Sequence, residues 1–97
     1  MENVKLHLDE TGSGQFYIDK NNERAGKMVF GISGNDLTVY HTEVLPKYEG
    51  KGLAKKLFSA MVKYAREKKL KVIPLCTYVL AQFEKHPEEY KDLWKSE

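Results

Sequence analysis

The sequence has 97 residues, a length that suits one domain, so we expect a single domain over residues 1–97. Hydrophobic residues make up 41% and charged residues 31%, which is typical of soluble globular proteins and excludes a disordered chain. The net charge of +2 is too small to indicate nucleic-acid binding, and no apolar run approaches the ~20 residues of a membrane-spanning helix. Cys76 is the only cysteine, which rules out an internal disulfide and favours a reducing, cytoplasmic setting. A monomer is expected.

The first half of the chain has the pattern of short strands separated by turns. Apolar, aromatic and β-branched residues gather at 4–8, 15–19, 27–33 and 37–45, and the segments between them are rich in Gly, Asn and Asp. Strands joined by such short turns favour an antiparallel meander.

The second half changes to helical spacing. From Leu53 the apolar residues recur along one face for about four turns, with lysines on the opposite face. The apolar run of residues 70–76 then predicts a buried strand. A strand, a helix and a strand form a β-α-β unit, so this strand should lie parallel to the one that ends near Leu45. The fold class predicted is therefore mixed α+β.

Pro74 lies inside that last predicted strand, although proline cannot donate a hydrogen bond to a neighbouring strand. One interpretation is an edge strand. The other is a strand that parts from its neighbour here and opens a gap facing Val44 and Leu45. Beyond Cys76, residues 78–86 look helical, and Pro87 predicts the start of another short helix that runs through Trp94.

Residues 49–54, "EGKGLA", connect a predicted strand to the N-terminus of the predicted helix. Helix N-termini carry unpaired N–H groups and partial positive charge, and glycines let a ligand come close to the backbone. The segment lacks the spacing of a P-loop and of a dinucleotide-binding loop. It is a candidate anion site, with a simple turn as the alternative.

Antiparallel strands followed by strand, G-x-G-x-A and helix resemble the GNAT superfamily of acetyl-CoA-dependent N-acetyltransferases. The family signature, [Arg/Gln]-x-x-Gly-x-[Gly/Ala], falls on residues 49–54, where Gly52 and Ala54 match. Glu49 departs from the signature, which has a cation or an amide there. A narrower resemblance is to very small GNAT-like proteins of about 100 residues, carried by "HTEVLP", "GKGLAKKL", "KVIPLC" and "HPEEYKDLW".

The resemblance implies a site for acetyl-CoA, with the pantetheine arm in the gap between the two parallel strands. Backbone N–H groups around Val44 would bind this arm or the thioester carbonyl. The backbone from Lys51 to Lys55 would take the pyrophosphate, and nearby lysines would offset the charge of Glu49. The coenzyme-binding residues expected are Val44, Lys47, Gly50, Lys51, Gly52, Leu53, Ala54 and Lys55.

Four side chains are candidates for catalysis. Cys76 ends the last predicted strand and could act as a nucleophile, although a free cysteine is commonly a small buried hydrophobe. Strict alternation places His41 on one face with Leu37, Val39 and Glu43; either His41 or Glu43 could be the general base, or an ordinary strand residue.

Tyr78 follows Cys76 by two residues, where many enzymes of the resembling family have a tyrosine that protonates the departing thiolate. The alternative is an aromatic side chain that packs on the sheet. Three scattered histidines and one cysteine do not indicate a metal site.

The leading hypothesis is an N-acetyltransferase that moves an acetyl group from acetyl-CoA to an unidentified amine or protein acceptor. The alternative is a non-catalytic coenzyme A-binding or protein-interaction module, which the small size of the chain favours. Nucleic-acid binding through the lysine-rich helix is a weaker third possibility, and no membrane partner is expected.

Overall fold

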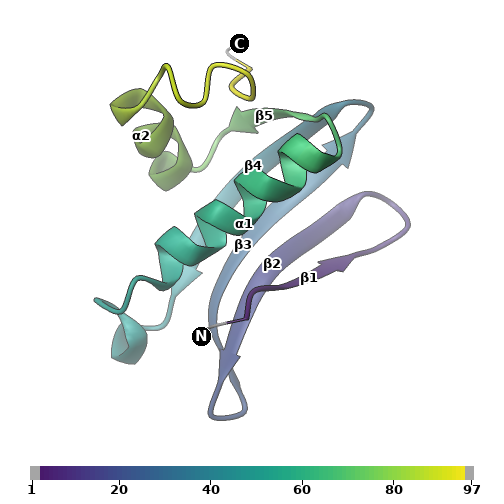
Figure 1. Ribbon diagram of the computed structural model, residues 1–97. Coiled ribbons are helices and arrows are strands. Elements are labelled where there is room, and N and C mark those ends of the chain that lie inside the picture. Colours follow the sequence, from purple (N-terminus) through teal and green to yellow (C-terminus); the bar gives the residue numbers. More distant parts are fainter. Residues whose placement is uncertain (1–2, 96–97) are drawn as a thin grey trace.

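The computed structural model describes residues 3–95, which form a five-stranded sheet and two α-helices (Figure 1). In chain order the elements are β1 (Lys5–Leu8), β2 (Ser13–Lys20), β3 (Glu23–Ser33), β4 (Asp36–Val44), the short 3-10 helix η1 (Pro46–Tyr48), α1 (Leu53–Glu67), β5 (Lys71–Pro74) and α2 (Thr77–Lys85). The predicted α+β class is confirmed.

The strands lie in the sheet in the order β1-β2-β3-β4-β5. Each of the first three pairs is antiparallel, and β4 and β5 are parallel with α1 between them, so the meander and the β-α-β unit are both confirmed.

The turn predicted over residues 20–26 is shorter than expected, because β3 already begins at Glu23. Asn21 and Asn22 make this turn alone, with φ of 52° and 64°, and asparagine tolerates the left-handed region that a two-residue hairpin turn requires.

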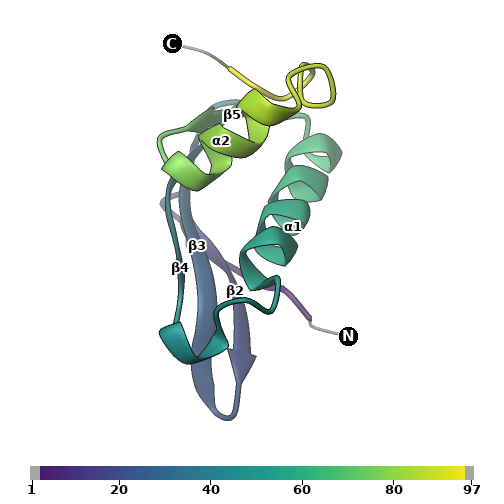
Figure 2. The ribbon, with the colours of Figure 1, turned by 90° about the vertical axis from the view of Figure 1, so that its left-hand side faces the viewer.

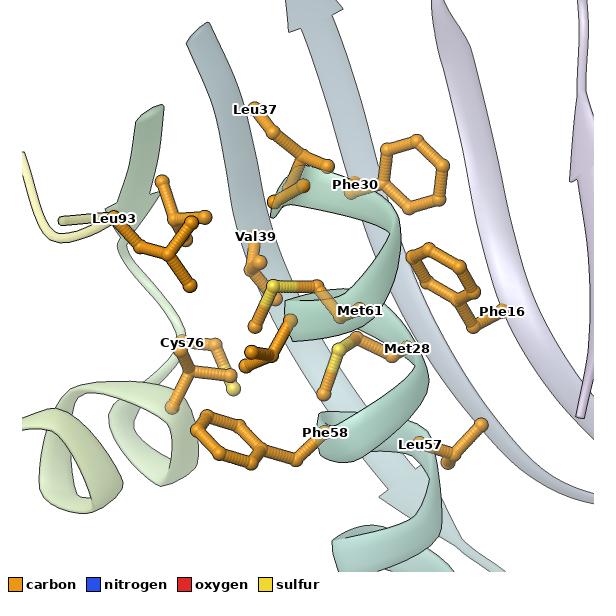
Figure 3. Close-up of a cluster of buried hydrophobic side chains, with 14 of the residues drawn as sticks. Phe16, Met28, Phe30, Leu37, Val39, Leu57, Phe58, Met61, Cys76 and Leu93 are labelled. Carbon is orange, nitrogen blue, oxygen red and sulfur yellow. The ribbon is translucent and has the colours of Figure 1, made fainter. Parts of the chain in front are cut away.

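The core lies between α1 and the face of the sheet that we call the inner face. Figure 2 shows the sheet nearly edge-on with α1 on one side of it. The strands supply Phe16, Ile18, Met28, Phe30, Leu37 and Val39, and α1 supplies Leu57, Met61 and Ala65, all of them at most 3% exposed (Figure 3). This burial is the main stabilising contribution to a domain of this size. Within residues 3–95, neither helix is long and apolar enough to cross a membrane.

A β-bulge at Tyr40 interrupts the alternation of β4. Phe30 pairs with Val39 and Val29 with His41, so Tyr40 is the extra residue between them. Leu37 and Val39 before the bulge are fully buried, whereas His41 after it is exposed. The prediction that His41 and Glu43 share a face with Leu37 and Val39 is therefore wrong. The two side chains lie on the outer face, away from α1.

The C-terminal segment forms turns in place of the predicted short helix from Pro87 to Trp94. The N–H of Val72 donates to the carbonyl of Leu93 at 2.8 Å, and the N–H of Lys95 donates to the carbonyl of Val72 at 2.9 Å. The segment thus runs beside the outer edge of β5 and supplies partners for its backbone. Within the segment only isolated turns form, such as the bond of 2.9 Å from the N–H of Trp94 to the carbonyl of Tyr90, while Leu93 and Lys95 bond to β5, so the helix prediction is wrong here.

Candidate functional site

The pairing of β4 with β5 ends early. The last pair is Val39 with Pro74, yet β4 continues to Val44. The N–H of Cys76 makes a final bond of 2.9 Å to the carbonyl of Val39 before the chain enters α2 at Thr77. The N–H that Pro74 lacks would face the other edge of β5, because the backbone groups of Val72, two residues earlier, bond there to Leu93 and Lys95. Both interpretations of Pro74 hold: β5 lies at the edge of the five-stranded sheet, and it parts from β4 at this proline.

The N-terminus of α1 lies beside the unpaired end of β4. Gly52 caps the helix with φ of 77°, Gly50 has φ of 80°, and neither glycine has a neighbouring atom within 4 Å of where a Cβ would be. The first helical bond runs from the N–H of Lys56 to the carbonyl of Gly52, and no side chain caps the helix. The N–H groups of residues 53–55 therefore have no partner within the helix and can bind an anion.

These two features enclose a cleft of about 350 Å³. Its lining is Val44, Tyr48, Glu49, Gly50, Gly52, Leu53, Ala54, Lys55 and Tyr78. The N–H of Leu45 donates to Ala25 on β3, so the alternation of a strand directs the backbone groups of Val44 the other way, into the gap. The cleft thus combines the uncapped N-terminus of α1 at one end with backbone polar groups along its wall.

Lys47 and Lys51 were expected at the coenzyme, but neither belongs to the cleft lining. Lys47 instead forms an ion pair of 2.5 Å with Glu23. Glu23 also accepts a 2.9 Å hydrogen bond from the hydroxyl of Tyr48, which in turn accepts one from Asn21. Bonding to Lys47 and then to Tyr48 lowers the pKa of Glu23, and the same ion pair raises the pKa of Lys47.

Tyr48 is a residue of the site that the sequence analysis missed. Its side chain is buried, it lines the cleft, and its hydroxyl ties η1 to the turn between β2 and β3. The glycine loop follows directly after it. The only sign of Tyr48 in the sequence was its position as an aromatic residue immediately before that loop.

Tyr78 reaches the cleft from the first turn of α2. Its ring makes an edge contact with Phe58 of α1, with the ring centroids 6.3 Å apart. Burial raises the pKa of Tyr78, so its hydroxyl stays protonated at neutral pH. The structure therefore brings together Tyr78, Val44 and the glycine loop, which are far apart in the sequence.

Cys76 lies inside the hydrophobic cluster of Figure 3 and is only 4% exposed. Its Sγ is 3.3 Å from the hydroxyl oxygen of Thr42. Cys76 is not part of the cleft lining. In its packing it matches the small buried hydrophobe of the sequence analysis, and its nucleophilic role stays a prediction.

His41 and Glu43 lie together on the outer face, at the part of β4 that β5 does not cover. The imidazole Nε2 is 4.0 Å from one oxygen of Glu43, and the amine of Lys27 is 3.7 Å from the other. Both side chains are more than half exposed. Within residues 3–95 no three His, Cys, Asp or Glu side chains gather as metal ligands would.

Comparison with known proteins identifies the family. Residues 15–93 match the family described as GCN5-related N-acetyl-transferase. The chain belongs to this family. A search of curated protein sequences finds no significant match to the chain.

Solved structures of GCN5-related N-acetyltransferases share the fold. A GCN5-like protein from Staphylococcus aureus is 30% identical, with a TM-score of 0.71 over 100% of this chain and 93% of that one. A ribosomal-protein-alanine N-acetyltransferase from Brucella melitensis is 14% identical, with a TM-score of 0.69 over 100% and 93% of the two chains. The aminoglycoside N-acetyltransferase AAC(6')-Iy, solved in complex with CoA, is 16% identical, with a TM-score of 0.56 over 89% of this chain and 69% of that one.

The Tyr48 hydroxyl predicts a measurable change in the titration of Glu23. In Tyr48→Phe the pKa of Glu23 should rise part of the way to its ordinary value, since one donor to the carboxylate is lost and Lys47 remains. Carboxyl-carbon NMR titration measures this directly. Tyr40→Phe, on an exposed side chain, is the matched control and should leave Glu23 unchanged. Identical Glu23 titrations in wild type and Tyr48→Phe would show that this hydrogen bond is absent.

Proposed function

We propose that the chain is an N-acetyltransferase that binds acetyl-CoA in the cleft between the end of β4 and the N-terminus of α1. One observation carries the proposal: in a member of this family, unpaired helix amides and an unpaired strand backbone face the same cleft. The first suits a pyrophosphate and the second suits the amide-rich pantetheine arm. The acceptor is an amine.

The pyrophosphate would lie on the backbone from Gly50 to Lys55, where the open space above Gly50 and Gly52 permits close approach. Lys55 lines the cleft and supplies positive charge. Lys51 is exposed within the loop and can add to this charge, whereas Lys47 is held by Glu23. Glu49 lines the same cleft, and its carboxylate opposes a bound phosphate.

The chemistry requires few groups. The nitrogen of the amine forms a bond to the acetyl carbon, the carbon–sulfur bond breaks, and the amine loses a proton. Backbone N–H groups near Val44 would stabilise the oxyanion. Tyr78 would donate its proton to the departing thiolate and regain one from solvent, and its raised pKa keeps the hydroxyl protonated before that step.

His41 or Glu43 would take the proton of the amine. Because both lie on the outer face, the amine would approach from that side while the coenzyme occupies the α1 side. The two reactants would meet along the stretch of β4 beyond Val39, where β5 no longer covers it. The burial of Cys76, outside the cleft lining, favours direct transfer over an acetylated cysteine.

The test of coenzyme binding is calorimetric titration with acetyl-CoA. Glu49→Gln removes a negative charge from the cleft and should tighten binding severalfold, with the effect decreasing as salt is added. Glu84→Gln makes the same change on an exposed position of α2 and should leave the affinity as it is. No heat of binding to the wild type would contradict the proposed function, and unchanged affinity in Glu49→Gln would contradict this placement of the phosphates.

The test of catalysis is the release of free coenzyme A in the presence of a panel of amines and peptides. Tyr78→Phe should lower kcat by about 100-fold while the affinity for acetyl-CoA is kept, since only a proton donor is lost. Cys76→Ala should retain most of the activity. Loss of all turnover in Cys76→Ala would instead support covalent transfer. Binding without turnover of any amine would favour a non-catalytic coenzyme A-binding module.

A further inference from the structure

Within residues 3–95, β1 is an edge strand that pairs with β2 alone. The N–H of Asp9 donates to the carbonyl of Ser13, which fixes the backbone groups of Lys5, His7 and Asp9 toward β2. The N–H and C=O groups of Leu6 and Leu8 therefore point outward from the sheet. They form a short, ready template for another strand.

The side chains of β1 add an apolar surface to this open edge. Leu6 and Leu8 pair with Phe16 and Gly14 on the inner face, and each is 41% exposed. The helix α1 packs mainly on β2, β3 and β4, and this leaves the two leucines at the margin of the core. A strand added at β1 would cover them.

We propose that β1 pairs antiparallel with β1 of a second copy of this chain, with His7 at the two-fold axis. Leu6 of each copy then lies opposite Leu8 of the other, and their outward N–H and C=O groups bond directly. The four leucines meet on the inner face. The two sheets join into one continuous sheet.

Charge selects the copy as the partner and fixes this register. With His7 on the axis, Lys5 of each copy lies opposite Asp9 of the other, and close opposite charges on neighbouring strands attract. A pairing centred on Leu6 would instead set Lys5 opposite His7 and lose both attractions. All hydrogen bonds that Asp9 receives from Thr11 and Ser13 end on Oδ1, so Oδ2 is left for Lys5 of the second copy.

The interface is small, because only β1 and the residue after it, Asp9, take part in each copy. It falls well below the ~1,000 Å² of a stable complex, so the dimer should exchange with a monomer. A monomer at micromolar concentration and a dimer near 1 mM is the expected behaviour.

Sedimentation of the full chain from micromolar concentration to about 1 mM tests the dimer. Lys5→Glu places a carboxylate opposite Asp9 at both ends of the interface, and this repulsion should weaken the dimer about tenfold. Lys91→Glu makes the same charge change on an exposed turn and should sediment like the wild type. Amide hydrogen exchange at both concentrations should show protection of Leu6 and Leu8 N–H only in the dimer.

Leu6→Pro is a second variant, which removes an outward N–H without taking a bond from the β1–β2 pair, and it should also abolish the dimer. Circular dichroism verifies that each variant is folded. A protein that is monomeric at the highest concentration would overturn the proposal. So would a dimer that Lys5→Glu leaves intact or that fails to protect these two amides.

Discussion

The rest of the site depends on the point where β4 and β5 stop pairing. The last bond of this pairing runs from the N–H of Cys76 to the carbonyl of Val39, and the chain then leaves the sheet to enter α2 at Thr77. Beyond that bond the backbone of β4 has no strand on one side. The chain after β4 passes through η1 and a glycine loop, so the N-terminus of α1 arrives beside the exposed backbone. The turn of the chain from β5 into α2 thus separates a closed sheet from a sheet with a cleft.

The bulge at Tyr40 distributes the candidate groups between the two faces of the sheet. Without the extra residue, His41 and Glu43 would lie in the core beneath α1, where their charge would be costly. With it, Val44 faces the cleft and the two polar residues face outward. This is the arrangement that a two-substrate transfer needs, since one reactant can approach from each face. Tyr48 ties η1 to the turn between β2 and β3, because its hydroxyl accepts a hydrogen bond from Asn21 and donates one to Glu23.

Much of this was predictable from the sequence. Periodicity gave the meander and the helix from Leu53, and a proline inside an apolar strand predicted the gap. The bulge was not predictable, because a run such as Val39-Tyr40-His41 has no glycine or other mark of an extra residue. The pairing of Lys47 with Glu23 joins residues on separate elements, which spacing alone cannot reveal. The prediction of a helix from Pro87 to Trp94 was wrong for the same reason, because Leu93 and Lys95 bond to the backbone of Val72 on β5.

The central claim is that the early end of the β4–β5 pairing forms the coenzyme cleft, and amide NMR during titration with acetyl-CoA tests it most directly. The account predicts that the largest shifts fall on the N–H groups of Val44 and of residues 53–55. These positions are distant in sequence and meet only at the cleft. The account would be contradicted if acetyl-CoA bound saturably but changed the chemical shifts of other amides and left those of Val44 and the first turn of α1 unchanged.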